Sequence, residues 1–250
     1  MHAVDQDEQA FLSQYNIHDY EVPLTSVDLV IFTVRAETLQ VLLVQRGEHP
    51  YRGWWALPGG FIDIHRDQDL EATALRKLQE KTGVLSPYLE PLQGFGNKTR
   101  DPRGWSTTFG YFALIPSDKL ELVHGARTEA AQWFPLSAIP TSLAFDHAEI
   151  LACGVSRLRS KVEYSSLLVH LLPSQFTLSE LQRMHEIVLG RTLDKSAFRK
   201  RIKDGDYLEE IPGQQRLGSN RPAQLYRCRP DKSTVYFSRA LGERQGSGAG

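Results

Sequence analysis

The pattern of apolar and polar positions divides the first half of the chain into strands and one helix. Over 69–81, Leu70, Ala74 and Leu78 recur every four positions, which predicts a helix that Gly83 ends. The segment 49–60 is rich in Gly, Pro and Trp and predicts a loop. Runs rich in β-branched and aromatic residues predict strands over 26–34, 40–46, 89–98, 107–114 and 131–134.

The pattern changes near Asp146, after which the chain is mainly helical. Residues 147–161 carry apolar side chains on one side and are rich in neither Gly nor Pro, which predicts a rigid linker helix. Two or three short strands are expected within 207–237, around a loop at 212–222. Shorter helical patterns follow the linker at 166–172, 178–189 and 195–203. The sequence therefore predicts an α+β protein of two domains.

The two ends of the chain differ from the rest in composition. Residues 1–20 are polar and acidic, which predicts a mobile arm or a short interface helix. The Gly- and Ser-rich end predicts a disordered tail. The expected units are an arm at 1–20, a first domain at 21–146, a linker helix at 147–161, a second domain at 162–240 and a tail at 241–250.

Composition narrows the class of protein. The 250 residues are 41% hydrophobic and 24% charged, a balance typical of a packed soluble protein. No apolar run approaches the roughly 18–20 residues of a membrane span, and no charged and apolar leader begins the chain. The two cysteines, Cys153 and Cys228, cannot build a disulfide framework. We therefore expect a cytoplasmic protein without a membrane partner.

The net charge of −1 hides an asymmetry between the two halves. Residues 1–150 carry −8 (12 Lys and Arg, 20 Asp and Glu), and residues 151–250 carry +7 (17 and 10). A basic half favours a nucleic-acid or other polyanionic partner. An ordinary basic domain without such a partner is the alternative.

The helix after the Gly-rich loop carries the first chemical motif. Arg76-Lys-Leu-Gln-Glu-Lys-Thr-Gly-Val84, downstream of Gly59-Gly60, resembles the Nudix signature Arg-Glu-apolar-x-Glu-Glu-x-Gly-apolar. Carboxylates at helix positions i, i+3 and i+4 share one face and can hold divalent cations. The resemblance implies an α/β/α sandwich with a mixed sheet. It also implies cleavage of pyrophosphate linkages with magnesium or manganese.

The departures from this signature are chemical. Glu80 keeps one helical glutamate, Lys77 and Lys81 replace the other two, and Gln68 stands at the upstream glutamate position. Replacing two carboxylates by ammonium groups shifts the local charge by about four units and repels a dication. We therefore expect no hydrolysis, no metal and no required cofactor. Either lysine could pair with a diphosphate instead, although a solvated helix face is the simpler interpretation of Lys81.

A second loop, Arg100-Asp-Pro-Arg-Gly-Trp105, is similar to a stretch in Nudix enzymes and sensors for ADP-ribose. Arg103 could clamp a phosphate, and Trp54 or Trp105 could cover a base or ribose. A plain turn with a surface arginine is the alternative. The expected ligand-binding residues are Arg46, Trp54, Gly59, Gly60, Phe61, Lys77, Glu80, Arg100, Asp101, Arg103 and Trp105.

The basic half is typical of a winged helix-turn-helix. In the helix over 195–203, Phe198 and Ile202 would face the core and leave cations outward, as in a helix that docks in the major groove. The loop Arg216–Pro222 is the expected wing. The expected DNA contacts are Lys195, Ser196, Arg199, Lys200, Arg201, Lys203, Arg216, Arg221, Tyr226 and Arg227.

Together, the two motifs resemble the Nudix-related transcriptional regulators of NAD metabolism, the NrtR family, over roughly residues 20–240. The resemblance implies a homodimer that binds a palindromic operator, represses NAD synthesis or salvage genes, and is released by ADP-ribose or a related nucleotide. Ligand would change the angle between the domains through the helix that follows Asp146.

Two alternatives stay open. The first is an ADP-ribose or NAD pyrophosphatase with a displaced metal site built from Asp67, Asp69, Glu71 and Glu80. The second is a related regulator that senses a sugar or sugar phosphate. The Asp101–Gly104 loop favours the nucleotide.

Overall fold

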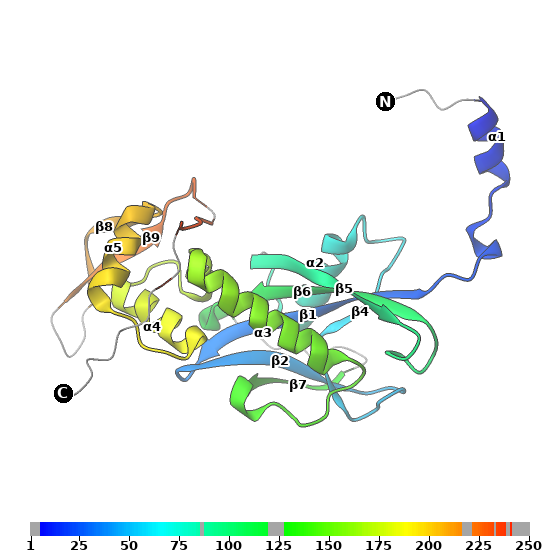
Figure 1. The fold of residues 1–250 in the computed structure, drawn as a ribbon, viewed down its shortest axis with the longest axis horizontal. Coiled ribbons are helices and arrows are strands. Elements are labelled where there is room, and N and C mark those ends of the chain that lie inside the picture. Colours follow the sequence, from blue (N-terminus) through cyan, green and yellow to red (C-terminus); the bar gives the residue numbers. More distant parts are fainter. Residues whose placement is uncertain are drawn as a thin grey trace.

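A mixed β-sheet forms the centre of the first half of the protein (Figure 1). The structure is a computed structural model that describes residues 6–85, 88–119, 128–216, 222–232, 234–238 and 241. The strand order is β3-β2-β1-β6-β5, with β4 paired to β1 and β7 paired to β2. The strands are β1 (Leu24–Arg35), β2 (Thr38–Arg46), β3 (Trp55–Ala56), β4 (Gly59–Phe61), β5 (Tyr88–Asn97), β6 (Ser106–Leu114) and β7 (Thr128–Pro135).

Strand pairing gives the sheet its mixed character. β1 and β6 run parallel, whereas β1 pairs antiparallel with β2 and β4. The predicted loop at 49–60 is wrong in part, because it contains β3 and the start of β4. Strands of two and three residues are too short to show the two-residue period by which a strand is recognised in a sequence.

One helix covers each face of the sheet. Alternate residues of β1 point to opposite faces, so that Leu29 packs with α2 (Leu70–Thr82) and Val30 packs with α3 (His147–Tyr164). Helix α2 begins after Asp69, whose carboxylate accepts from the Ala72 N–H, and ends at Gly83 in the left-handed region. These features confirm the predicted helix and the α/β/α arrangement.

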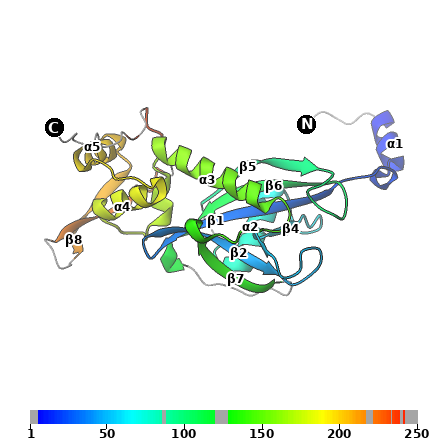
Figure 2. The same ribbon diagram turned by 60° about the horizontal axis from the view of Figure 1, so that its bottom comes forward.

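The predicted linker helix, α3, packs against the sheet and is no free-standing connector. Gly154 allows the close approach, because a Cβ atom there would lie 3.0 Å from Val30 Cγ2. From the sheet α3 continues into the helical half (Figures 1 and 2). Buried side chains of α3, such as Ile150 and Leu158, belong to one core cluster with Leu181 and Phe198 of that half. Apolar periodicity could not predict this contact with the sheet, because it shows that a helix face is buried and not which partner covers it.

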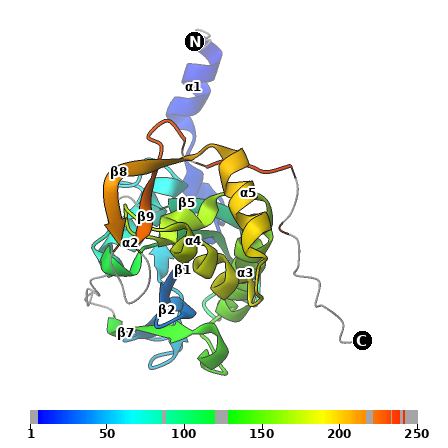
Figure 3. The same ribbon diagram turned by 90° about the vertical axis from the view of Figure 1, so that its left-hand side faces the viewer.

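The second half contains a helical pair and a β-hairpin, seen end-on in Figure 3. The segment after α3 is the 3₁₀ helix Leu167–Leu171, and then come α4 (Leu178–Leu189), α5 (Lys195–Gly205), β8 (Leu208–Arg216) and β9 (Ala223–Cys228). Thr177 and Glu180 form a capping box at the start of α4, and the Asp194 carboxylate caps α5. The helix, turn, helix and hairpin predicted for this half are confirmed.

The ends of the chain differ from each other. Helix α1 (Gln6–Gln14) and the 3₁₀ helix Ile17–Asp19 extend away from the sheet (Figure 1). The predicted tail begins too early, because Leu241 is buried and its N–H donates to the Glu163 carbonyl over 3.1 Å. Residues 242–250 lie outside the described part of the chain. No helix among the described residues is long and apolar enough to cross a membrane.

The close approach of α3 to the sheet makes a direct prediction. We expect Gly154→Val to lower the free energy of unfolding by about 1–3 kcal/mol, because the added atoms meet Val30 in a packed core. Urea denaturation measures this change. Ser156→Val, at an exposed position of the same helix, is the matched control and should stay within about 0.5 kcal/mol. An equal effect of both substitutions would contradict the packing.

Candidate functional sites

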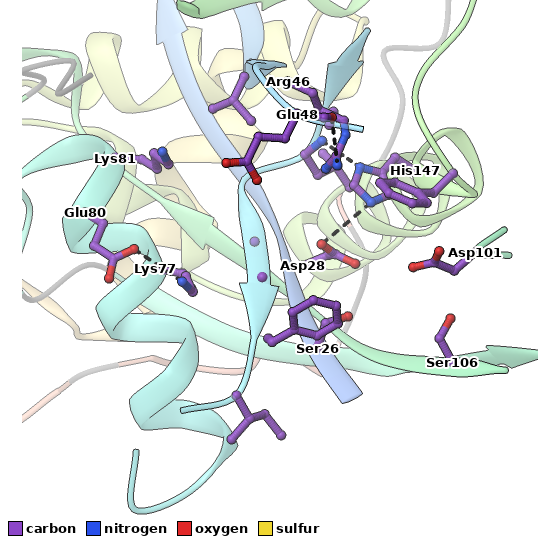
Figure 4. Close-up of a pocket in the computed structure, with 18 of the residues that line it drawn as sticks. Ser26, Asp28, Arg46, Glu48, Lys77, Glu80, Lys81, Asp101, Ser106 and His147 are labelled. Carbon is purple, nitrogen blue, oxygen red and sulfur yellow. Dashed lines mark hydrogen bonds and ion pairs between the residues drawn. The ribbon is translucent and has the colours of Figure 1, made fainter. Parts of the chain in front are cut away.

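A cavity of about 810 Å³ opens between α2, β1, β4 and the start of α3 (Figure 4). Most of the predicted ligand residues line it. The sequence placed these residues on separate loops and helices, and the fold gathers them at one place. The predicted residues in the lining are Arg46, Gly59, Gly60, Phe61, Lys77, Glu80, Arg100, Asp101 and Arg103.

Helix α2 gives the cavity a cationic wall. The Lys77 side chain lies over Gly60, where a Cβ atom would be 3.1 Å from Lys77 Cε, and its Nζ is 3.4 Å from the Glu80 carboxylate. Burial lowers the pKa of Lys81, an effect that Glu80 opposes and Lys77 reinforces. Two ammonium groups therefore face the cavity where the family signature has carboxylates.

Arg76 joins α2 to the loop before it. Its guanidinium donates to both oxygens of Asp67, over 2.6 and 2.5 Å, and to Glu80 over 3.1 Å. The hydrogen bonds from Arg76 hold the pKa of the Asp67 carboxyl far below its usual range. Arg76 thus ties the loop before α2 to the helix.

The acidic residues of the displaced metal site do not meet at the cavity. Asp67 is paired with Arg76, Asp69 caps α2, and neither they nor Glu71 line the cavity. Glu80 does line it, between Arg76 and Lys77. In the part of the chain that the structure describes, no group of three or more His, Cys, Asp and Glu side chains could hold a metal ion.

Asp28 and His147 form the floor of the cavity, and the sequence analysis missed both. Asp28 lies on β1 opposite Gly59 of β4, and His147 is the first residue of α3. The Leu57 N–H donates to His147 Nδ1 over 2.8 Å, and His147 Nε2 lies 3.6 Å from Asp28 Oδ1. Burial lowers the pKa of His147, so the ring is neutral at pH 7. The sequence contained one signal for this site: Asp28 is a single charged residue inside an otherwise apolar strand.

Arg100 connects the second loop to the start of α3. It donates to both carboxylate oxygens of Asp146, over 2.8 and 2.9 Å, and to Ser106 Oγ over 3.2 Å. Its side chain is buried and its guanidinium is largely satisfied within the protein. Although Arg100 lines the cavity, the structure gives it a positioning role instead of an outward-facing one.

Arg103 stands at the mouth of the cavity. It donates to both oxygens of Asp101, over 3.0 and 2.7 Å, and these hydrogen bonds raise the pKa of Arg103. Its guanidinium lies over the Phe61 ring at 5.1 Å, and the side chain is 41% exposed. An arginine that is oriented by a carboxylate and reaches solvent is placed to meet an anion that enters the cavity.

Three predicted ligand residues lie at or beyond the edge of this cavity. Arg46 lines it, but its Nε donates to the Pro50 carbonyl over 2.8 Å and its guanidinium lies over Phe145. Trp54 is outside the lining and packs edge-on against Tyr51. Trp105 lines an adjoining groove, to which Arg103 also contributes.

Helix α5 forms a candidate nucleic-acid interface. Phe198 and Ile202 are buried, as predicted, and Lys195, Ser196, Arg199, Lys200 and Lys203 are exposed. Arg201 is the exception: its Nη2 donates to the Glu163 carbonyl over 2.6 Å, and its guanidinium lies 4.0 Å from the centroid of Phe237. Because Arg201 lies three residues after Phe198, it shares the inward face, so its prediction as a DNA contact does not match its position.

The hairpin after α5 holds its basic residues in ion pairs. Arg216 lies 3.4 Å from Glu180, and Arg227 lies 2.5 Å from Glu209. The Tyr226 hydroxyl donates to Glu210 over 3.1 Å. Arg221 and most of the predicted wing lie outside the described residues. Arg216 on β8 and Arg227 on β9 are nevertheless exposed.

The fold and the two sites define a Nudix domain joined to a DNA-binding winged helix. Residues 24–152 match the NUDIX domain family, and residues 168–228 match the NrtR DNA-binding winged helix domain. The chain is 48% identical over 237 residues to the ADPR responsive transcriptional repressor NtrR of Acinetobacter baylyi, which covers 94% of this chain and 93% of the relative. The protein belongs to the NrtR family.

Solved structures agree with this assignment. NrtR of Shewanella oneidensis in complex with a 27mer DNA is 42% identical, with a TM-score of 0.81 over 87% of this chain and 99% of that one. The NUDIX domain of the same protein in complex with ADP ribose has a TM-score of 0.56 at 42% identity, over 60% of this chain and 98% of that one. The predicted family and the predicted fold class are confirmed.

The Arg76–Asp67 pair predicts a pH-dependent stability. Because the folded state lowers the pKa of Asp67, its contribution is fully present above about pH 4, the unfolded value, and is lost as the pH falls towards the folded value. We expect Asp67→Asn to cost about 2–4 kcal/mol at pH 7, since it leaves Arg76 without a buried carboxylate partner.

Urea denaturation between pH 7 and pH 3 tests this prediction. The difference between wild type and Asp67→Asn should shrink as the pH falls below 4. Asp69→Asn is the matched control, because asparagine caps a helix about as well as aspartate, and it should change stability by less than about 0.5 kcal/mol. A difference that is constant over this pH range would refute the assignment.

Proposed function

We propose that this protein is a homodimeric transcriptional repressor of NAD biosynthesis or salvage genes, released from a palindromic operator by ADP-ribose or a related nucleotide. One observation carries the proposal: a single chain joins a Nudix cavity with a lysine wall to a winged helix with an exposed basic α5. The Acinetobacter relative is named as ADPR responsive, and the Shewanella relative is seen with DNA and with ADP ribose. Such a repressor acts in the cytoplasm.

The cavity, in this proposal, binds a diphosphate without hydrolysing it. Lys77 and Lys81 supply the positive charge that a metal supplies in the hydrolases, and Arg103 closes the mouth. The same two lysines repel a dication beside the single glutamate Glu80. An ADP-ribose pyrophosphatase of Methanocaldococcus jannaschii is 29% identical, but over 56% of this chain, whereas the repressor relative covers nearly all of it.

Helix α3 is the proposed route between the two sites. Its first residue, His147, lies on the cavity floor, and the residue before it, Asp146, is held by Arg100. Its apolar side chains share one core cluster with α4 and α5. A ligand that moves the start of α3 would therefore change how the winged helix is held. In a dimer this alters the spacing of the two α5 helices, and half-site spacing is a strict geometric requirement.

Selection of bound duplexes from a random pool, with and without ADP-ribose, tests the function. We expect a palindrome with half-sites about one helical turn apart at near-physiological salt, and its loss when ADP-ribose is added. By linkage, operator must weaken ADP-ribose binding by the same factor. Equal binding to every duplex would instead indicate a non-specific basic surface. Magnesium-dependent release of phosphate products would favour the enzyme.

A substitution of Lys77 tests whether release by ADP-ribose depends on the cavity. We expect Lys77→Gln to keep operator affinity and to raise the ADP-ribose concentration needed for release about tenfold, because a charge-assisted contact is lost. Lys98→Gln, at an exposed position outside the cavity, is the control and should release like wild type.

Neighbouring residues of α5 should behave differently. We expect Lys200→Ala to weaken binding to all duplexes, to lower the salt slope by about one and to leave the melting temperature unchanged, because Lys200 is exposed. Arg201→Ala should instead destabilise the fold, since its guanidinium holds Glu163 and Phe237. Salt-dependent DNA binding and thermal unfolding of both variants measure the two effects. An unchanged salt slope for Lys200→Ala would exclude a phosphate contact there.

A further inference from the structure

Asp28 is a buried carboxylate whose partners in the described part of the protein, Arg100 and His147, lie at long range. It is 6% exposed and lines the cavity. It forms an ion pair with Arg100 Nη2 at 3.5 Å and contacts His147 Nε2 at 3.6 Å, and both distances are longer than an ordinary hydrogen bond. Buried carboxylates normally have their acceptors satisfied, because an unmet one is costly. Because neither contact is a short hydrogen bond, the Asp28 carboxylate can still accept from a group that enters the cavity.

Neither Arg100 nor His147 donates a short hydrogen bond to Asp28. Arg100 uses its short hydrogen bonds on Asp146 and Ser106. His147 Nδ1 accepts from the Leu57 N–H, so the single proton of the neutral ring is on Nε2. That proton faces Asp28 across 3.6 Å, and the neutral ring adds no charge. A carboxylate only accepts hydrogen bonds, so a ligand group that binds Asp28 must be a donor such as a hydroxyl.

The position of Asp28 relative to Lys77 indicates which hydroxyls of a ligand would donate to it. Consecutive residues of β4 contact the two groups: Gly59 pairs with Asp28, and Gly60 lies under the Lys77 side chain. At Gly59 there is no room for a side chain, since a Cβ atom would lie 2.2 Å from Asp28 Oδ1. An anion-binding group and a hydroxyl acceptor thus adjoin each other, with Ser26 on the same face of β1 (Figure 4).

We infer that Asp28 determines ligand specificity by accepting hydrogen bonds from the sugar hydroxyls of a nucleotide whose diphosphate lies against Lys77. This inference rests on the proposed function. In a nucleoside diphosphate the ribose is esterified to the phosphates through its 5′ oxygen, so a sugar site next to the phosphate site matches the positions of Asp28 and Lys77. The two carboxylate oxygens can take both hydroxyls of a ribose, as acidic residues do in dinucleotide-binding folds. Asp28 Oδ1 lies 3.6 Å from His147 Nε2, so the inferred sugar site adjoins the first residue of α3.

Calorimetry with three ligands and the Asp28→Asn variant tests the inference. The ligands are ADP-ribose, with two riboses, ADP, with one, and inorganic pyrophosphate, with none. We expect Asp28→Asn to weaken ADP-ribose binding at least tenfold, because charge-assisted hydrogen bonds are lost. Pyrophosphate binding should stay the same or tighten, because a negative charge beside an anion is removed. The result for ADP shows which ribose Asp28 contacts.

Glu48→Gln is the matched control, since it removes a negative charge from the same cavity. It should shift the affinities for all three ligands in one direction by a similar factor. The inference is overturned if Asp28→Asn binds ADP-ribose within twofold of wild type, or if it weakens all three ligands equally, as a purely structural role would.

A second measurement begins with wild-type protein alone, so its first result does not depend on how the variant folds. Wild-type protein is titrated with ADP-ribose analogues that lack the hydroxyls of one ribose or the other. One analogue should bind at least tenfold more weakly, and the same deletion should cost nothing further in Asp28→Asn. If wild type binds both analogues as tightly as ADP-ribose, the role of Asp28 is overturned but the proposed effector is not. If wild-type protein bound to operator is not released by ADP-ribose and binds none, the proposed effector fails as well.

Discussion

Helix α3 packs on the sheet over most of its length, from His147 to Lys161, and its C-terminal part contacts the second half through Arg159 and Glu163. Its apolar side chains, among them Ile150 and Leu158, lie in one core cluster with residues of both halves. Packed cores are stiff, so a displacement at one end of such a helix cannot be absorbed locally. The cavity floor at His147 and the orientation of α5 consequently depend on the same packing.

The charge in the cavity explains how a Nudix fold can serve as a binding module. Lys77 and Lys81 occupy the face of α2 that would otherwise hold a metal, while Arg76 keeps its loop-tethering hydrogen bonds to Asp67. The contact that ties the loop to the helix is therefore kept, and the cavity wall carries two ammonium groups beside Glu80. Asp28 and His147 add polar groups to the floor, at the point where the cavity meets α3.

Much of the fold could be predicted because its signals are local. Apolar periodicity gave the bounds of α2, α4 and α5 to within two residues, and Gly83 ends α2 as expected. Contacts between distant segments could not be read in this way. Arg201 carries the same charge as Lys200, yet it turns inward because Glu163 and Phe237 meet α5 on that side.

The sequence by itself determined the two modules, the loss of the helical glutamates and the basic character of α5, because each depends on residues close together in the chain. Only the tertiary structure decided that α3 lies on the sheet, that Trp54 is outside the cavity and that Asp28 faces it. These depend on pairings between residues far apart in the chain, such as Asp28 with Gly59 and Leu57 with His147. Hydrophobic periodicity identifies which face of an element is buried but not which partner covers it.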